Sequence, residues 1–539
     1  FFACLNLFMF FMLTLVLAGN FVLLFVGWEG VGLSSYLLIG FFFVKKIAAD
    51  AGKKAFIVTR IGDFGFTLGL LLMFWTFRSL DYAAVFSAVR ERPVESAGQA
   101  GVLTSICLLL LAGAIGKSAQ LPLYVWLPDA MEGPTPVSAL IHAATMVAAG
   151  VYMVARCHVL YEHAPVALLA VAVVGALTAF YSATIGLVET DIKKVLAYST
   201  ISQLGYMFLG CGVGAFAAGI FHLMTHAFFK AQLFLAAGSV IHAMSGEQDM
   251  RRMGGLRKKI PWTYGTMLMA ALAIAGTPLF SGFFSKEEIL EAVRSAPHAN
   301  AVLWTLGLIG AMLTSFYIFR LMFLTFHGPP RFDEHQTHVH ESPKKMLVPL
   351  VVLALLSTVG GWVAAPGLVG GVNHFDRFLD PVFRASAPRL EGPAPTAEQV
   401  SQQGSSRALE LFPALLGPPV IVSLVGFLVA WSFYIRRPQT PERLAESFPT
   451  PYEVLRNKYY VDELYARVIV RPLVWLSERL LWRVVDEGAI DGSVNGVAHV
   501  ARAFGDRVRH IQSGNTRSYA AWIVLGAVVF TTLLIWMVR

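Results

Sequence analysis

The sequence is poor in charged residues and in cysteine. Of its 539 residues, 14% are charged and 56% are hydrophobic, whereas about 25% of the residues of soluble globular chains are charged. This composition excludes a soluble globular protein and predicts a polytopic membrane protein. The cysteines lack metal-ligand spacing, so we expect neither an iron–sulfur site nor a disulfide framework. They are Cys4, Cys107, Cys157 and Cys211.

Apolar runs long enough to cross a membrane recur from one end of the chain to the other. About 20 apolar residues cross a hydrocarbon core, and the chain has roughly thirteen such runs. They lie near residues 1–18, 20–43, 55–77, 101–121, 136–157, 165–188, 195–213, 214–241, 263–292, 300–326, 346–366, 411–435 and 519–538. We predict that all are helical, because an isolated spanning segment must satisfy its own backbone hydrogen bonds.

Basic residues gather in alternate loops between these runs. The loops contain Lys45, Lys46, Lys53 and Lys54, then Lys193 and Lys194, then Arg251, Arg252, Arg257, Lys258 and Lys259, and finally Arg436 and Arg437. The other short loops carry fewer basic residues. Loops rich in basic residues usually lie on the cytoplasmic side of a membrane, so this alternation predicts that the basic loops share the cytoplasmic face.

Two apolar runs contain residues that interrupt helices. Pro122 and Pro128 interrupt the run that carries Lys117, and the stretch "AGTPLFSGFFSK" interrupts the run that carries Lys286. Proline and glycine leave backbone polar groups without their helical hydrogen bonds. Such groups are tolerated at membrane depth only where other parts of the protein or a water-filled cavity can bind them. Paired interrupted helices are typical of the ion site of a transporter, although each could also be a packing kink.

Ionisable residues within the apolar runs are the strongest functional signal. Burying a charge at the centre of a bilayer costs from about 3 to more than 10 kcal/mol. The residues in question are Glu29, Arg60, Asp63, Lys117, His142, His222, His226, Lys230 and Lys286. His222, His226 and Lys230 recur every four residues and therefore share one helical face. Arg60 and Asp63, three residues apart, can pair in a similar way. A lone histidine could be a structural hydrogen-bonding group, but a file of such groups favours proton transfer.

Several long motifs resemble those of one known family. They are "GWEGVGLSSYLLIGF", "DIKKVLAYSTISQLGYM", "HLMTHAFFKA", "LFSGFFSKEEIL" and the stretch from Gly116 to Tyr152. These motifs resemble the subunit L family, the antiporter-like, proton-pumping membrane subunits of bacterial respiratory complex I (NADH:quinone oxidoreductase). The resemblance covers nearly the whole chain.

The resemblance implies an all-α fold of two inverted five-helix repeats, each with a broken helix. It implies a first repeat at 1–188, a second at 189–327, further helices and loops at 328–450, a lateral amphipathic helix at 451–515 and a terminal transmembrane helix at 516–539. About three N-terminal helices of the family would then be absent from this sequence.

The resemblance also implies roles for the ionisable residues. Glu29 and Lys117 resemble the family's carboxylate–lysine pair, with Arg60 and Asp63 as neighbouring partners. His142 and His226 look like bridging groups on the central polar axis. Lys230 resembles the central lysine of the family, and Lys286 resembles the lysine nearest the exit. Together with His222, these residues would form a proton path. From the opposite charges in the bilayer, we expect Glu29 and Lys117 to form a switchable pair.

Two segments outside the spans carry weaker signals. The loop residues His335, His338 and His340 could bind a metal, but a solvated loop is the simpler interpretation. The segment 371–410, rich in Pro, Ser, Gly and Gln, is predicted to be an extramembrane loop, partly disordered.

The region after Arg436 is too charged to span a membrane. Its apolar residues recur at helical spacing, as in Leu476, Leu480 and Val484, which predicts an amphipathic helix. It could lie at the surface of its own bundle, whereas the resemblance implies a lateral helix along neighbouring subunits. Pro472 and the glycines at 488, 492 and 496 predict that it is not one straight rod.

Together these features predict a proton-translocating subunit of NADH:quinone oxidoreductase in the bacterial plasma membrane. We expect no cofactor in this chain, with NADH, FMN, iron–sulfur clusters and quinone bound by partner subunits. The expected partners are the other membrane subunits of the complex and the lipid bilayer, without nucleic acid. Two alternatives remain, a subunit of a multi-subunit cation/proton antiporter and a membrane subunit of a hydrogenase-type complex. The lateral helix and its terminal anchor favour complex I over both.

Overall fold

The computed structural model describes residues 1–96, 98, 100–296, 301–333, 335, 337–364, 373–383 and 417–539. Regular structure in these residues is helical, apart from two isolated β-bridges, Asn20 with Asp81 and Asp191 with Asp249. The predicted all-α class is therefore confirmed. The chain forms two compact units, Phe1–Tyr459 and Tyr460–Arg539. We describe each unit by itself.

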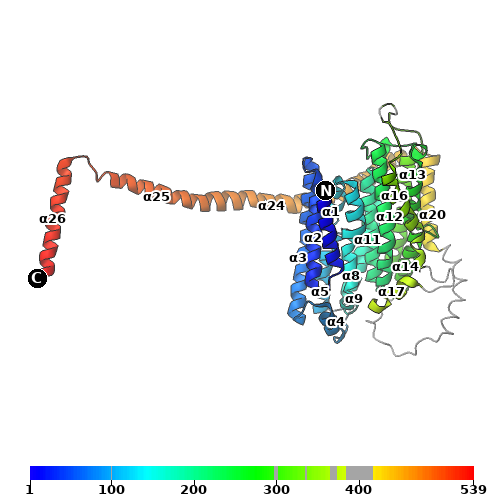
Figure 1. Ribbon diagram of the computed structural model, residues 1–539, viewed down its shortest axis with the longest axis horizontal. Helices are drawn as coiled ribbons and strands as arrows, with labels where there is room; N and C mark the ends of the chain where they lie inside the picture. The colour runs from blue at the N-terminus through cyan, green and yellow to red at the C-terminus, as the bar shows by residue number, and fades with distance from the viewer. Residues whose placement is uncertain are drawn as a thin grey trace. The chain divides into compact units, whose positions relative to one another are not determined.

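The first unit is a bundle of long helices that run side by side (Figure 1). Its longer helices are α1 (Phe2–Val16), α2 (Phe21–Ile39), α3 (Lys46–Phe77), α5 (Val102–Lys117), α10 (Pro165–Gly186), α11 (Ile192–Gly212), α12 (Phe216–Ala243), α13 (Pro261–Ala275), α14 (Ser281–Ser295), α15 (Ala301–Phe326), α16 (Lys344–Val359) and α20 (Pro418–Trp431). Shorter helices are α4 (Tyr82–Arg90), α6 (Trp126–Asp129), α7 (Thr135–Ala139), α8 (Ala149–Arg156), α9 (His158–Glu162), α17 (His374–Phe383), α21 (Thr440–Ser447) and α22 (Pro449–Arg456). A π-helical turn, η3 (Leu140–Thr145), and a 3-10 turn, η4 (Met146–Ala148), join α7 to α8.

The helices match the predicted spans closely. Among the described residues, nine helices are long and apolar enough to cross a membrane. The other predicted spans correspond to α1 and α5, which are shorter, to α11, and to the interrupted pair α13 and α14. The last predicted span but one includes residues 411–416, which lie outside the described residues.

The first predicted interruption separates α5 from α6. Helix α5 ends at Lys117, and residues 118–125 form turns, with a left-handed φ of 49° at Ala119. The indole of Trp126 donates to the carbonyl of Gly116 at 3.0 Å, and so satisfies one of the carbonyls that a helix end leaves free. The break is therefore a stable feature, fixed by side chains that follow it.

The second predicted interruption separates α13 from α14. Helix α13 is capped by Gly276, whose φ of 78° is left-handed, as is usual for a glycine after a helix. Figure 1 shows α13 toward one end of the bundle and α14 toward the other. Both runs that we expected to be broken are thus broken, and each break lies next to a lysine of interest.

Small residues allow the helices to approach closely. A Cβ atom at Gly175 of α10 would lie 2.5 Å from the backbone nitrogen of Leu209 in α11, and one at Gly205 of α11 would lie 2.6 Å from that of Ala179. Helices in a membrane associate through such packing, because lipid is as apolar as the side chains it replaces. Helices α3 and α5 meet in the same way at Gly62 and Gly116.

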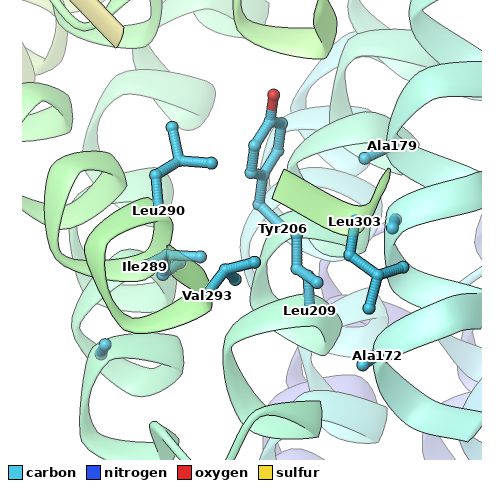
Figure 2. Packing of buried hydrophobic residues seen from close by; sticks show 10 residues of the cluster. Ala172, Ala179, Tyr206, Leu209, Ile289, Leu290, Val293 and Leu303 are labelled. Carbon is cyan, nitrogen blue, oxygen red and sulfur yellow. The ribbon is translucent and has the colours of Figure 1, made fainter. Parts of the chain in front are cut away.

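An apolar cluster joins α11 to the second broken helix. Figure 2 shows Tyr206 of α11 between Leu290 and Val293 of α14 on one side and Leu303 of α15 on the other, with its hydroxyl directed away from them. That hydroxyl donates to the carbonyl of Gly307 at 2.5 Å. The cluster fixes α14, and with it Lys286, against α11.

The second unit consists of one long helical path and a final helix. The path comprises α23 (Val461–Tyr465), η12 (Ala466–Val470), α24 (Arg471–Leu476), η13 (Ser477–Asp491) and α25 (Gly492–Arg509), and the final helix is α26 (Thr516–Val538). Pro472 lies in α24, Gly488 in η13, and Gly492 and Gly496 in α25, so none of them ends the path. Residues 461–509 therefore form a continuous helical path within the region 451–515, where the sequence predicts an amphipathic helix.

The remaining loop predictions are tested only in part. Within the predicted loop 371–410, residues 374–383 form helix α17, and the other residues lie outside the described ones except Asn373. Among the described residues, no group of three or more His, Cys, Asp or Glu could hold a metal ion. His340 instead hydrogen-bonds through Nδ1 to the carbonyl of Glu341 at 3.1 Å.

Candidate functional site

The first ionisable cluster surrounds Lys117 at the end of α5. The ammonium of Lys117 is fully buried and lies 3.2 Å from Oδ2 of Asp63 in α3. The indole of Trp28 in α2 donates to the other oxygen of Asp63 at 2.6 Å. Because both carboxylate oxygens are bound, Asp63 is held facing Lys117, and the buried cation has the partner that makes its burial tolerable.

Glu29 belongs to the same cluster but pairs with another residue. Its carboxylate forms an ion pair with Arg60, and Arg60 lies 4.0 Å from Asp63. Arg60 therefore lies within ion-pair distance of the residue with which we expected it to pair. We expected Lys117 to pair directly with Glu29, whereas in the structure Lys117 pairs with Asp63 and Arg60 lies between the two acids. Four alternating charges therefore form one chain.

A glycine makes room for the Lys117 ammonium. A Cβ atom at Gly32 of α2 would lie 2.6 Å from Nζ of Lys117, which is closer than van der Waals contact allows. The string "GWEGVGLSS" thus supplies both the carboxylate Glu29 and, one turn later, the space for the lysine. Spacing in the sequence alone could not reveal this contact, because the two residues come from different helices.

His142 lies beyond the first break, in the π-helical turn η3. Its ring is fully buried, and Nε2 hydrogen-bonds to Oγ of Ser35 in α2 at 3.0 Å. Trp126 packs edge-on against the ring at 5.9 Å. A π-helical turn inserts one extra residue and occurs often at functional sites. Helix α2 therefore contributes a side chain to both the Lys117 cluster and His142.

The stripe His222, His226 and Lys230 lies on α12 and is buried throughout. The two imidazole rings are 6.2 Å apart, and Lys230 donates to the carbonyl of Leu196 in α11 at 2.9 Å. The predicted common face is confirmed by this burial and ring contact. Among the described residues, Lys230 has no ion pair with an acid, in contrast to Lys117.

His222 connects the stripe to the second broken helix. Its Nδ1 hydrogen-bonds to Oγ of Ser285 in α14 at 2.8 Å, and its Nε2 to Oε1 of Gln203 in α11 at 3.2 Å. The residue after Ser285, Lys286, donates to the carbonyl of Ile274 at 2.8 Å. That carbonyl belongs to the last turn of α13, where a cation is also favoured by the helix dipole. Lys286 is thus seated on the end of the broken helix.

Buried polar atoms without a hydrogen-bond partner accompany these residues. Among the described residues they include Oγ of Ser118, Oε1 of Gln120, Oγ of Ser138, Nδ1 of His142, Nε2 of Gln203 and Nε2 of His226. Most buried polar groups have a partner, either from protein or from ordered water. These atoms therefore mark places along the file where water molecules fit the chemistry of the site.

Sequence reasoning missed several polar residues of this site. Lys193, which we assigned to a basic loop, is buried, and its ammonium donates to the carbonyls of Met131 and Gly133. Ser285 and Gln203 were also missed, because a serine or glutamine within an apolar run carries no distinctive signal. The only clues were that Ser285 adjoins Lys286 and that Gln203 lies in the motif "DIKKVLAYSTISQLGYM".

Comparison with known proteins shows the family to which the chain belongs. Residues 18–314 match the family model described as NADH:quinone oxidoreductase/Mrp antiporter, TM. The chain is 42% identical to NADH-quinone oxidoreductase subunit L of Neisseria meningitidis, with 99% of this chain and 82% of the relative covered. It is 44% identical to subunit L of Rhodobacter capsulatus, with 100% of this chain and 83% of the relative covered. The chain belongs to the NADH-quinone oxidoreductase subunit L family.

Relatives beyond these two extend the similarity. The subunit L of Mycobacterium tuberculosis is 45% identical, with 99% of this chain and 80% of the relative covered. A chain in a solved structure of the Mrp complex from Dietzia sp. is 26% identical to this chain with a TM-score of 0.63. The match covers 100% of this chain and 52% of the other. The fold of this chain is therefore similar to that of part of a chain in the Mrp complex.

Proposed function

We propose that this chain is a proton-translocating subunit of NADH:quinone oxidoreductase in the plasma membrane. The observation that carries the proposal is the row of buried lysines, Lys117, Lys230 and Lys286, which are 0%, 0% and 4% exposed. Each lies at a helix break or beside a histidine, in a membrane where unused charges are costly. Membership of the subunit L family supports the same function.

In this proposal protons move along the file of lysines, histidines and carboxylates through bridging water. Lys117 exchanges its proton when its contact with Asp63 changes, and Glu29 acts on that contact through Arg60. His142 and the stripe on α12 carry the proton between the two breaks, and Lys286 passes it on. The unpartnered polar atoms along the file support this role, because water that satisfies them would also connect the ionisable groups.

We propose that redox chemistry takes place in partner subunits. NADH, FMN, iron–sulfur clusters and quinone would bind there, and this chain would respond to a conformational or electrostatic change. The amphipathic path at 461–509 would contact neighbouring antiporter-like subunits, since large apolar residues such as Leu473, Trp475 and Trp482 are exposed in its unit. The division into repeats at 1–188 and 189–327, with the later segments at 328–450, 451–515 and 516–539, belongs to the same proposal.

A second candidate function is ion exchange in a multi-subunit cation/proton antiporter. The similarity to the Mrp complex favours it, and it needs no redox partner. The experiment that separates the two is affinity purification of the intact membrane complex through this chain. We expect the NADH dehydrogenase and iron–sulfur subunits to co-purify and the complex, reconstituted in vesicles, to pump protons on NADH addition. A complex that lacks those subunits and exchanges cations for protons would establish the antiporter.

A further inference from the structure

Helix α12 carries a second polar stripe that the proton file does not use. Thr225, Gln232 and Ser239 recur every seven residues, so they lie on nearly the same side of the helix. All three are buried. At 1.5 Å per residue, the stripe extends for about 21 Å along the helix, which is a large part of the hydrocarbon thickness of about 30 Å.

The two ends of the stripe have identified partners. At the inner end, Thr225 hydrogen-bonds to Ser285 at 2.8 Å, and Ser285 is also bound to His222. At the outer end, Ser239 hydrogen-bonds to Thr263 at 2.7 Å and to Ser342 at 2.6 Å. The stripe therefore runs from the proton file toward the face that carries the basic loops.

The outer end reaches a carboxylate at that face. The hydroxyl of Thr263 donates to Glu341 at 2.6 Å, and the backbone nitrogen of Trp262 donates to the same carboxylate at 2.8 Å. Glu341 thus caps the start of α13 and lies only two hydrogen bonds from Ser239. It is partly exposed, so water on the basic face can reach it.

The middle of the stripe is the decisive part. Neither Nε2 nor Oε1 of Gln232 has a partner among the described residues, although the residue is fully buried. A buried polar group without a hydrogen-bond partner is destabilising, because it has lost its bonds to water without replacing them. Polar residues in membrane helices often serve as glue between helices, but glue requires a partner on another helix. Within the described part of the chain Gln232 has none, and water is the partner that fits a carboxamide with free donors and acceptors.

A second unpartnered group lies at the same level on α16. Phe228 of α12 meets Gly360 at the end of α16, with 2.9 Å between the Phe228 ring and a Cβ atom at Gly360. The helices run in opposite directions, so Gln232 and Ser357 each lie about one turn from that contact, toward the basic face. The hydroxyl of Ser357 is also buried without a partner among the described residues. Gln232 and Ser357 therefore lie at a similar level on two helices that pack together.

We propose that Thr225, Gln232 and Ser239 line a file of water molecules that connects Glu341 at the basic face with Ser285 and His222. Hydroxyl and carboxamide groups both donate and accept hydrogen bonds, so they can order water without holding a charge. The file supplies water, and through it protons, to the part of the chain beside Lys286. Its use for protons rests on the proposed function, but its existence does not.

The test of the file is chemical access, which does not depend on pumping. The variant Gln232→Cys and the matched control Leu233→Cys are made in the whole complex, since Leu233 is equally buried on the same turn. Membrane vesicles with the basic face outward are treated with a small, positively charged methanethiosulfonate reagent. We expect the thiol introduced by Gln232→Cys to be labelled and that of Leu233→Cys to remain unlabelled. Equal labelling of the two variants, or none of either, would overturn the proposal.

A second pair of variants keeps the test valid if Gln232→Cys does not assemble. Ser239→Cys and its buried neighbour variant Val240→Cys should differ in the same direction, and equal labelling would again count against the file. Gln232→Leu should also reduce protons transported per electron, whereas Thr358→Val, which removes a hydroxyl bonded within α16, should not. If Gln232→Leu pumps normally while Lys230→Ala does not, the file does not supply protons and the proposed function stands.

Discussion

Replacing Asp63 with asparagine separates the charge of the first cluster from its shape. Asparagine can still accept from the indole of Trp28, but it no longer balances the ammonium of Lys117, which lies 3.2 Å away. At that distance, with an effective dielectric constant of about 20, the lost attraction is about 5 kcal/mol. Because about 1.4 kcal/mol is tenfold, the charged form of Lys117 should become roughly several thousandfold less favoured.

The assay is proton transport into vesicles that contain the assembled complex, followed with a pH-sensitive dye during NADH oxidation. We expect Asp63→Asn to leave the subunit content normal and to lower the number of protons transported per electron strongly. Glu29→Gln is the comparison, because Glu29 is paired with Arg60 and acts on Lys117 only indirectly. It should have the same effect but to a smaller degree. A normal proton-to-electron ratio in Asp63→Asn would show that the ion pair of Lys117 is structural.

Three further predictions concern packing and the second unit. Gly32→Ala places a methyl group against the Lys117 ammonium and should reduce pumping in a complex of normal composition; unchanged pumping would exclude a positional requirement at Lys117. Gly205→Val should push α10 away from α11 near Ala179 and so lower the amount of assembled complex seen on native gels. An unaltered band of assembled complex would contradict this prediction. A short flexible insertion near Gly492 should weaken assembly of the complex if the long helix serves to hold neighbouring subunits together. Full assembly with lost pumping would indicate instead that the helix transmits motion to the proton path.

The spans and the breaks could be predicted because they depend on local sequence. Spans follow from runs of apolar residues, and breaks from proline and glycine, which act on the backbone where they stand. The common face of His222, His226 and Lys230 likewise follows from their spacing, because a helix returns to the same side about every four residues. Each of these features involves one helix at a time and does not depend on how the helices pack.

The partners of the charged residues could not be predicted in the same way. Asp63 and Glu29 are both acidic residues near Lys117, and only the packing of α2, α3 and α5 decides which of them contacts the lysine. Lys193, which the sequence assigns with Lys194 to a basic loop, lies in the first turn of α11, and its burial depends on the carbonyls of Met131 and Gly133 in a distant turn. Such choices are made by tertiary contacts that leave no periodic pattern in the sequence.

The amphipathic helix shows a limit of local signals. Pro472 and the glycines predict that it is not one straight rod, since proline removes a backbone donor and glycine weakens a helix by up to about 1 kcal/mol. In the structure Pro472 occurs just after the π-helical turn η12, and Gly488 lies within η13. The path thus remains helical through these residues, with π-helical turns before Pro472 and around Gly488.

The central claim is that the buried lysines carry protons, and Lys230 tests it most directly. Lys230 contacts a backbone carbonyl and no acid among the described residues, so its replacement leaves no buried carboxylate unpaired there. The decisive measurement is the proton-to-electron ratio of the reconstituted complex with Lys230→Ala and with Lys230→Arg. We predict a strong loss in both, because a guanidinium keeps its proton and alanine has none to give. A normal ratio in Lys230→Ala, with NADH oxidation and subunit content unchanged, would contradict this role.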